Sequence, residues 1–371
     1  MRIIFAGGGT AGHINPALAV AGYIREHDKS AKILYVGAVD SMEEKLAKRA
    51  GFDFKGIHIS GFSREISIRG LKKNLITAKR IVTSSIESKK IIKEFKPDIC
   101  MGTGGYVSGP VLKTAHSLGV PIIIHEQNAF PGVANKMLSK RAEKVMLASE
   151  EARKYFNEKC DIVLTGNPVR MQIINADKKI AREKLGLDSR PVVLSFGGSL
   201  GARKVNEAVA DLIVDTSKDD RYQHIHAYGK YGKWFNDLLM QKGVDIKKHP
   251  NLDIREFIDN MDMCLAAADI VICRAGAITL SELQVQGKAS ILIPSPNVAE
   301  NHQYHNAMSM VKNNAAEILE EKDLTGASLI AKVDKILKNK DILDKLELNA
   351  KNMSIVNTNE KIYDIIKKIV G

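Results

Sequence analysis

The chain has 371 residues and a formal net charge of +12, with 44% hydrophobic and 26% charged residues. This length favours two domains, and the composition is ordinary for a soluble globular protein. No apolar run approaches the roughly 18 residues of a membrane-spanning helix. The short apolar stretch at the N-terminus runs at once into glycines, which predicts a first strand rather than a signal peptide. The four cysteines have no C-x-x-C spacing, so we expect reduced, mostly buried cytosolic thiols.

The positive charge is concentrated in the first half of the chain. Residues 1–166 carry 26 Lys and Arg against 16 Asp and Glu, whereas the remainder carries 29 against 27. Ten basic and three acidic side chains lie between Arg64 and Lys96, interleaved with Ile and Leu. This pattern suits either a surface helix on anionic lipid headgroups or a helix packed on its own domain. The stretch holds no Tyr or Trp for base stacking, which argues against a nucleic-acid partner.

Short, β-branched apolar runs alternate with helix-like stretches along the chain. This alternation predicts parallel sheets covered by helices on both faces, and because the series restarts after Arg190 we expect two doubly wound α/β domains. We place the first domain at 1–166, the second at 167–355, and an amphipathic helix at 356–371 that returns to the first. The segment Gly166–Arg190 is the expected linker. The predicted strands are 2–6, 32–36, 98–101, 121–124, 144–147 and 161–164, then 191–196, 222–228, 270–273 and 289–293.

A glycine loop, Gly7–His13, follows the first predicted strand. We expect Asn15 to cap the next helix and Pro16 to be its first residue, so that the loop and the helix N-terminus form an anion cradle. The loop departs from the dinucleotide fingerprint because His13 takes the place of its last glycine. In addition, Asp40 comes too late after the second strand to hold a ribose, and both departures argue against a dehydrogenase. His13 is the candidate general base.

Two further motifs follow strands of the first domain. The loop Gly102–Pro110 is a second strand-to-helix anion turn, and two such turns on one sheet edge suit a pyrophosphate-bearing substrate. The sequence His125-Glu126-Gln127-Asn128 places amides suited to a sugar at a strand's carboxyl end. His125 and Glu126 are equally well interpreted as a structural hydrogen-bonded pair. No second His follows at zinc-helix spacing.

The second domain carries three comparable segments. Gly197–Arg203 is another strand–glycine–helix turn, with the Ser199 hydroxyl placed to bond a phosphate oxygen. The segment Arg274–Glu282 leads from a buried strand into a helix, and its Glu282 could accept hydrogen bonds from both ribose hydroxyls. The segment 300–303, before a helix expected at 304–312, offers amides for sugar hydroxyls.

These motifs together resemble the MurG family of UDP-N-acetylglucosamine transferases over essentially the whole chain. The resemblance implies a GT-B fold with a cleft between its domains, and inverting transfer of N-acetylglucosamine to undecaprenyl-pyrophosphoryl-muramyl-pentapeptide. A different GT-B transferase with another lipid or small-molecule acceptor would use the same loops. The shared motifs are G-G-T-x-G-H at 8–13, G-G-Y-V-S-G-P at 104–110, H-E-Q-N at 125–128, T-G-N-P-V-R at 165–170, G-G-S-x-G-A-R at 197–203 and the segment 274–282.

The resemblance also implies roles for particular residues. Ser199 would meet the donor phosphates, Ile258 the uracil and Glu282 the ribose. Ala11 stands where many members have Gly, and His302 stands where some have a second Gln. The remaining implied donor contacts are Thr10, Ala11, Gly12, Asn128, Arg170 and Gln303, and the implied contacts to the acceptor pyrophosphate are Gly9, Gly104, Gly105, Tyr106 and Ser108.

The expected location is the cytoplasmic face of the cell membrane, as a peripheral protein, because the implied acceptor is a lipid. The sequence has no D-x-D motif that would clamp Mg²⁺ on a diphosphate, so we expect neither an essential metal nor a cofactor.

Overall fold

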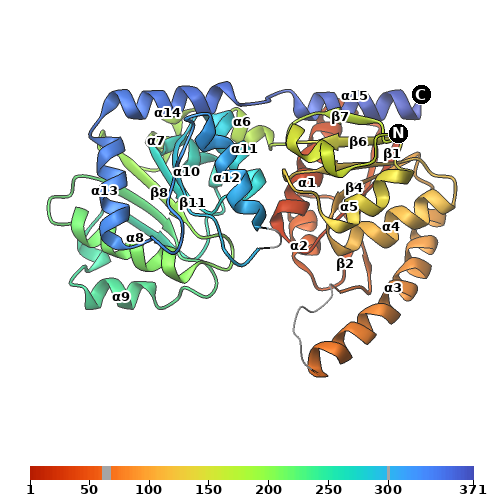
Figure 1. Ribbon diagram of the computed structural model, residues 1–371, viewed down its shortest axis with the longest axis horizontal. Helices are drawn as coiled ribbons and strands as arrows, with labels where there is room; N and C mark the ends of the chain where they lie inside the picture. Colours follow the sequence, from red (N-terminus) through yellow and green to blue (C-terminus); the bar gives the residue numbers. More distant parts are fainter. Residues whose placement is uncertain (61–67, 299–300) are drawn as a thin grey trace. The chain divides into compact units, whose positions relative to one another are not determined.

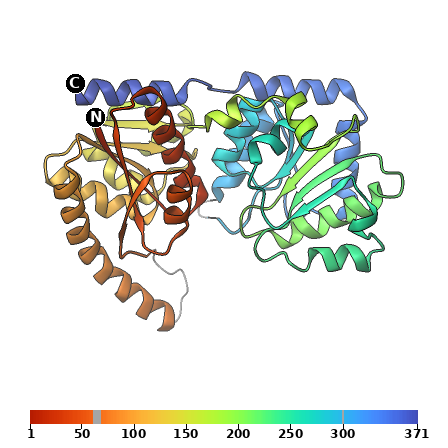
Figure 2. The same ribbon diagram turned by 180° about the vertical axis from the view of Figure 1, so that it is seen from behind.

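The computed structural model describes residues 1–60, 68–298 and 301–371, with the side chains of 68–79, 81 and 82 also outside the description. The chain forms two units, each built on its own parallel sheet (Figures 1 and 2). The first unit is Met1–Arg170 with Ile355–Gly371, and the second is Met171–Ser354. The predicted α/β class with two doubly wound sheets is confirmed.

The sheet of the first unit has seven parallel strands in the order β3-β2-β1-β4-β5-β6-β7. The strand order reverses direction between β1 and β4, which lie side by side. The strands are β1 (Arg2–Gly7), β2 (Lys32–Ala38), β3 (Asp53–Ile57), β4 (Ile99–Gly104), β5 (Ile122–Glu126), β6 (Lys144–Leu147) and β7 (Ile162–Leu164). The helices are α1 (Ala11–His27), α2 (Met42–Arg49), α3 (Ile68–Phe95), α4 (Gly105–Ser117), α5 (Val133–Leu138) and α15 (Thr358–Val370).

Alternate residues of each strand feed separate cores on the two faces of this sheet. In β1, Ile3 and Phe5 pack with α1 and α15, whereas Ile4 and Ala6 pack with α3 and α4. All four side chains are fully buried. Helices cover both faces of the sheet, so side chains on both sides of the strand are buried, which is why Ile3–Ala6 are all apolar.

The second unit repeats this plan with the strand order β10-β9-β8-β11-β12-β13 and a reversal between β8 and β11. The strands are β8 (Val192–Phe196), β9 (Gln223–Ala227), β10 (Leu252–Arg255), β11 (Ile270–Cys273), β12 (Ala289–Leu292) and β13 (Glu317–Ile318). The helices are α6 (Met171–Ile174), α7 (Lys178–Lys184), α8 (Arg203–Thr216), α9 (Phe235–Gln241), α10 (Met261–Ala267), α11 (Ala277–Gln286), α12 (His302–Lys312), α13 (Gly326–Leu337) and α14 (Lys340–Asn352).

All ten predicted strands are present, but the sequence analysis missed β3, β10 and β13. Each missed strand lies at the edge of its sheet, is partly exposed and contains charged residues. An edge strand buries less of its surface than a central one, so its sequence lacks the continuous apolar run that identified the others.

Three local predictions are wrong. Helix α1 begins at Ala11 with Thr10 as its N-cap, so Asn15 and Pro16 lie inside it rather than at its start. The amide groups of His13 and Ile14 already bond the Thr10 carbonyl, which starts the helix earlier. Strand β4 continues to Gly104 and passes directly into α4, so the second glycine segment contains almost no loop. Residues expected to form a linker instead build α6 and α7, which pack against α10 and α11.

Helix α15 packs beside α1 in the first unit. Ile362 and Ile366 are fully buried in the core that α1 shares with the sheet. The rings of Tyr23 and Tyr363 meet edge to face with their centroids 6.0 Å apart. Thr358, the first residue of α15, also connects this helix to the residue after β7, because its hydroxyl donates to the Thr165 carbonyl at 2.8 Å.

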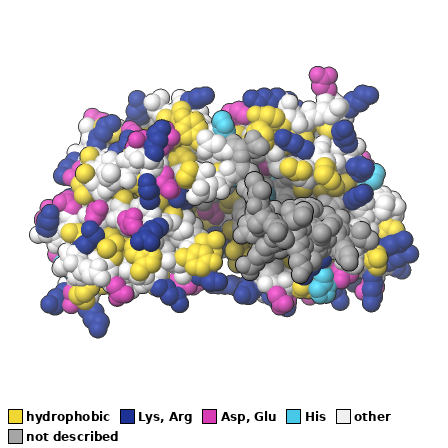
Figure 3. All heavy atoms as spheres, turned by 60° about the horizontal axis from the view of Figure 1, so that its bottom comes forward, with side chains coloured by type: hydrophobic (Ala, Val, Ile, Leu, Met, Phe, Trp, Pro, Cys, Tyr) yellow, Lys and Arg dark blue, Asp and Glu magenta, His cyan; other side chains and the backbone are white. Residues whose placement is uncertain are grey.

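The basic stretch from Arg64 to Lys96 falls mostly on α3, which is a 28-residue helix. Most of the side chains on which the lipid-surface hypothesis depends, including Arg69, Lys72, Lys73 and Lys79, lie outside the described residues. On the face seen in Figure 3, the described Lys and Arg side chains are interspersed with acidic and apolar ones. No helix in the described part of the chain has the length and apolar character that crossing a membrane requires.

Candidate active site

The candidate site of the first unit lies where its strand order reverses. Strands β1 and β4 are neighbours there, and each passes through glycines into a helix, α1 or α4. Ligands of doubly wound sheets bind at this kind of point, because the loops on either side of it separate. No side chain of the described residues caps either helix. Both N-termini therefore retain the unpaired amides that favour an anion.

The two glycine segments pack backbone against backbone. The Gly8 amide donates to the Gly104 carbonyl at 3.3 Å. Gly105 has φ +78°, and a Cβ atom there would lie 2.1 Å from the Gly8 carbonyl oxygen. A Cβ on Gly104, whose φ is +102°, would lie 2.9 Å from Nδ1 of His13. The glycines are thus required by the close approach of two loops and one imidazole.

Replacing Gly105 by Ala is expected to destabilise the first unit much more than replacing Gly119 by Ala. Both glycines have positive φ, +78° and +76°, but nothing lies within 4 Å of a Cβ at Gly119. Gly119→Ala should cost about 1–3 kcal/mol from backbone strain alone, and Gly105→Ala about 1–3 kcal/mol more because the loops must separate. Urea unfolding followed by circular dichroism measures both; equal losses would contradict the loop contact.

A buried carboxylate supports the first glycine loop. Glu43 of α2 is 1% exposed, and its two oxygens accept from the amides of Ala38 at 3.2 Å and Gly9 at 3.3 Å. A Cβ on Gly8 would lie 2.4 Å from Glu43 Oε1. Burial, and to a smaller extent the charge of the nearby Glu43, raises the pKa of Tyr106 to about 12, so the Tyr106 hydroxyl stays protonated. The sequence analysis missed Glu43, because nothing in the local sequence distinguishes it from its neighbour Glu44.

His13 projects from the first turn of α1 into the junction of these loops. Its Nδ1 lies 3.1 Å from the Thr103 carbonyl oxygen and 3.2 Å from Oε1 of Gln127. A backbone carbonyl can only accept, so a neutral imidazole carries its hydrogen on Nδ1. The ring is half-buried. The second nitrogen, Nε2, is then the unprotonated one, which is the form that a general base needs.

The predicted pair of His125 and Glu126 is not a hydrogen-bonded pair, because each has other partners. The Glu126 carboxylate is 1% exposed and accepts from the Asn128 amide at 3.0 Å, the Asn128 side chain at 3.2 Å, the Gly132 amide at 3.0 Å and the Asn135 side chain at 2.9 Å. Glu126 therefore holds the loop after β5 and orients the Asn128 amide.

The structure places the other residues implied for the first unit as follows. Gly9, Thr10 and Gly12 are exposed at the start of α1, beside the half-buried Ala11. Tyr106 lies against Gly9. Ser108 is fully buried, and its hydroxyl oxygen lies 2.6 Å from the Ala6 carbonyl oxygen and 2.8 Å from that of Gly104, which share its single hydrogen. That hydroxyl fastens α4 to the end of β1. Arg170 is half-buried and is the last residue of the first unit's main segment.

In the second unit, the corresponding reversal between β8 and β11 carries the predicted Ser199 segment. Ser199 is exposed in the loop between β8 and α8. This loop rests on the loop after β9: the Lys230 amide donates to the Ser199 carbonyl at 3.1 Å, and a Cβ on Gly201 would lie 2.2 Å from the Tyr228 carbonyl oxygen. The α8 N-terminus lacks a side-chain cap from the described residues. It is therefore suited to an anion.

The remaining residues implied for the donor gather around the same sheet edge. Ile258 follows β10, Glu282 is 8% exposed in α11, and Gln303 lies in the first turn of α12. Oε1 of Gln303 accepts from the Ser295 amide at 2.9 Å, which fixes the loop after β12. The sequence analysis did not identify the support from Arg274, which donates to the Ile293 and Pro294 carbonyls at 3.2 and 3.1 Å. Glu300 lies outside the described residues.

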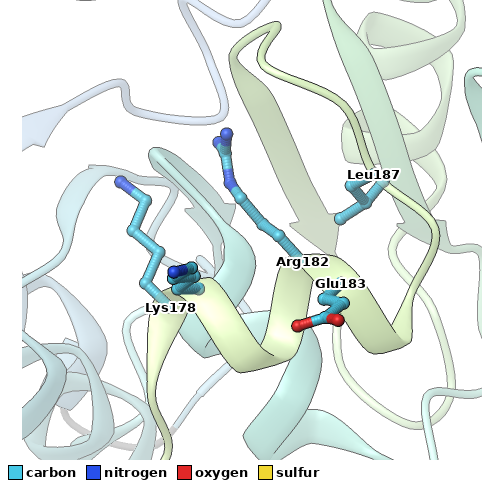
Figure 4. Close-up of a pocket in the computed structure, with 5 residues that line it drawn as sticks. Lys178, Arg182, Glu183 and Leu187 are labelled. Carbon is cyan, nitrogen blue, oxygen red and sulfur yellow. The ribbon is translucent and has the colours of Figure 1, made fainter.

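A surface pocket of about 780 Å³ lies along α7 in the second unit (Figure 4). It is lined by Lys178, Lys179, Arg182, Glu183 and Leu187. Lys178 and Arg182 are already engaged by Asp269, with 2.7 Å between Lys178 Nζ and Asp269 Oδ1. These ion pairs fasten α7 to the second unit, and the motifs described above contribute nothing to this pocket.

Comparison with known proteins assigns both units to one family of enzymes. Residues 3–147 match the glycosyltransferase family 28 N-terminal domain, and residues 192–369 match the family 28 C-terminal domain. A relative from Acetivibrio thermocellus is 43% identical over 371 residues, covering 100% of this chain and 98% of the relative. A second relative, from Ruminiclostridium cellulolyticum, is 40% identical, with 100% of both chains covered.

Both relatives are named UDP-N-acetylglucosamine–N-acetylmuramyl-(pentapeptide) pyrophosphoryl-undecaprenol N-acetylglucosamine transferase. The crystal structure of Acinetobacter baumannii MurG matches the fold with a TM-score of 0.72 at 27% identity, covering 99% of each chain. The chain belongs to the MurG family. The expected GT-B fold is confirmed, and the MurG-family chain is a glycosyltransferase.

Proposed function

We propose that this chain transfers N-acetylglucosamine from UDP-N-acetylglucosamine to the C4 hydroxyl of undecaprenyl-pyrophosphoryl-muramyl-pentapeptide, with inversion at the anomeric carbon. The observation that carries the proposal is the 43% identity over the whole chain to a relative named for this transfer. The two glycine-loop edges support it, because donor and acceptor each contain a pyrophosphate and each unit offers uncapped helix N-termini.

His13 is the proposed general base of the reaction. The acceptor hydroxyl oxygen forms a bond to the anomeric carbon while the bond from that carbon to the UDP oxygen breaks. The hydroxyl proton passes to Nε2 of His13, whose other nitrogen is held by the Thr103 carbonyl. UDP leaves with the electron pair of the broken bond. The amides at the α8 N-terminus and the Ser199 hydroxyl are suited to stabilise the negative charge on its phosphates.

The two units take different substrates in this proposal. The first unit, with Gly9, Gly104, Gly105 and Tyr106, binds the pyrophosphate of the acceptor. The second unit, with Ser199, Ile258, Glu282 and Gln303, binds the UDP-sugar. Thr10, Ala11, Gly12, Asn128 and Arg170 are further proposed donor contacts contributed by the first unit.

A direct transfer assay tests the function. Purified chain, radiolabelled UDP-N-acetylglucosamine and a shortened lipid-linked muramyl-pentapeptide should give a labelled disaccharide lipid and UDP. UDP-glucose should transfer poorly, and NAD should not raise the thermal unfolding temperature. Stabilisation by NAD without stabilisation by UDP-N-acetylglucosamine would overturn the assignment.

We also propose that the chain works as a peripheral protein on the cytoplasmic face of the membrane, where α3 contacts anionic lipid. In flotation assays, binding is expected to vesicles containing anionic lipid and not to neutral vesicles. Each basic residue near such a surface contributes about 1 kcal/mol. Replacing Lys72, Lys73 and Lys79 together by Gln should therefore weaken binding about a hundredfold. Equal binding to both kinds of vesicle would contradict this proposal.

Three exposed lysines of the second unit provide a matched control for the flotation assay. Replacing Lys218, Lys233 and Lys340 together by Gln removes the same charge, and all three are exposed. This variant should float like the parent protein if α3, rather than net charge, makes the contact.

A further inference from the structure

A chain of hydrogen bonds leads from His13 into the buried end of the first unit. Nδ1 of His13 lies 3.2 Å from Oε1 of Gln127, and Nε2 of Gln127 lies 3.1 Å from Nδ1 of His125. Nε2 of His125 lies 2.8 Å from the Gly166 carbonyl oxygen. His125 is fully buried and Gln127 is 3% exposed, so solvent does not compete for these bonds.

The direction of every bond in this chain follows from its inner end. The Gly166 carbonyl can only accept, so Nε2 of His125 carries a hydrogen. Burial lowers the pKa of His125 to about 4, so the ring is neutral at pH 7 and its Nδ1 has a lone pair. The group that faces this lone pair must be a donor, so it is the NH₂ group of the Gln127 side chain. The carbonyl end of Gln127 therefore faces His13 and accepts its Nδ1 hydrogen.

Other contacts keep Gln127 from turning over. Its Nε2 also donates to the His125 carbonyl at 3.0 Å, so both amide hydrogens are used. The same His125 backbone carbonyl accepts from the Asn135 side chain at 3.0 Å, and the backbone carbonyl of Gln127 accepts from the Asn167 side chain at 3.3 Å. A flipped amide would place its NH₂ against the Nδ1 hydrogen of His13 and its oxygen against two acceptors.

We propose that Gln127, held in one orientation by His125, is a positioning residue that keeps the His13 hydrogen on Nδ1 and leaves Nε2 as the base. This inference rests on the proposed role of His13. Gln127 and the Thr103 carbonyl act on the same nitrogen, at 3.2 and 3.1 Å, and so define both the tautomer and the ring plane. His125 acts through Gln127 and has no contact with a reacting atom.

The parent protein itself provides the first test. Long-range ¹H–¹⁵N correlation spectra of the ¹⁵N-histidine-labelled chain at pH 8 distinguish the two neutral tautomers of each ring. His13 and His125 should have opposite tautomers, with the hydrogen on Nδ1 in His13 and on Nε2 in His125. Spectra of His13→Gln and His125→Phe identify the two signals. A His13 ring with its hydrogen on Nε2 would overturn the proposal.

The variant Gln127→Glu gives the second test, because it places a carboxylate against His13 with little change in size. An opposite charge this close favours the imidazolium, so the proton affinity of His13 in the same spectra should rise at least tenfold. Because a tenfold rise in proton affinity from that of an ordinary histidine leaves about a third as much neutral imidazole at pH 7, the rate constant kcat at pH 7 should fall about threefold or more. It should recover as the pH is raised, with a smaller change in KM for the donor. An unchanged His13 titration in folded Gln127→Glu, at a pH where the introduced carboxyl is ionised, would overturn the proposal.

The two readouts separate this inference from the proposed function. A shifted His13 titration with an unchanged kcat would support the positioning contact and refute His13 as the base. Gln223→Glu is the matched control, since Gln223 is a 3% exposed glutamine of the second unit with backbone partners. It should leave the His13 signals and their titration unchanged.

Discussion

His13→Ala is expected to lower kcat about 10²–10⁴-fold, the range that a positioned general base contributes. The variant removes the imidazole that lies between the Thr103 carbonyl and Gln127, and no second imidazole shares that position among the described residues. KM for UDP-N-acetylglucosamine should change by no more than a few-fold, because the proposed role is proton removal from the acceptor. Initial rates over both substrate concentrations measure the two constants.

His27→Ala is the control for this experiment. His27 lies in the last turn of the same helix, where its Nδ1 bonds the Tyr23 carbonyl at 2.8 Å and its ring stacks on Tyr23. The kcat of the His27→Ala variant should stay within threefold of the parent value. If His13→Ala also retains kcat within a few-fold, His13 is not the base.

The second unit is expected to lose about 4 kcal/mol of unfolding free energy between pH 7.5 and pH 5. His224 and His226 are buried in β9 and bond the hydroxyl groups of Thr216 and Ser195, both at 2.8 Å. Burial lowers the pKa of each ring from 6.5 to about 3, with smaller contributions from Arg221 for His224 and from His224 for His226.

The sign follows from the proton balance of the two states. Between about pH 3 and pH 6.5 the unfolded chain binds protons at these positions and the folded chain does not. Stability is therefore complete above pH 6.5 and falls as the pH drops below it. Each histidine lowers the free energy of unfolding by about 2 kcal/mol at pH 5, because that pH lies 1.5 units below the unfolded pKa of 6.5 and each unit corresponds to about 1.4 kcal/mol.

Trp234 makes this pH effect measurable in one unit. It is the single tryptophan of the chain and lies in the second unit, so its fluorescence during urea unfolding follows that unit. Replacing His224 by Leu should remove about half of the loss between the two pH values. Replacing the exposed His305 by Gln should change nothing. A free energy that is the same at both pH values would contradict neutral burial of the pair.

Local sequence patterns predicted much of the scaffold. The central strands are buried on both faces, so runs such as Ile122–Ile124 and Ile270–Cys273 identify themselves by composition. The edge strand β3 escaped because its side chains alternate between exposed and partly buried. The start of α1 was predicted from Asn15 and Pro16, and that prediction failed because the Thr10 carbonyl accepts the first bonds of the helix, which leaves Pro16 inside it.

The sequence by itself determined the two doubly wound units, the glycine turns that end their strands and His13 as the outstanding titratable group beside them. These features depend on residues close together in the chain, where composition and spacing act directly. Only the tertiary structure decided which polar side chains bond other parts of the protein. Ser108 turns inward to Ala6, 102 residues away, and Gln127 meets His13 across 114 residues. No local pattern encodes such pairs, because they exist only once neighbouring strands bring distant loops to the same edge of the sheet.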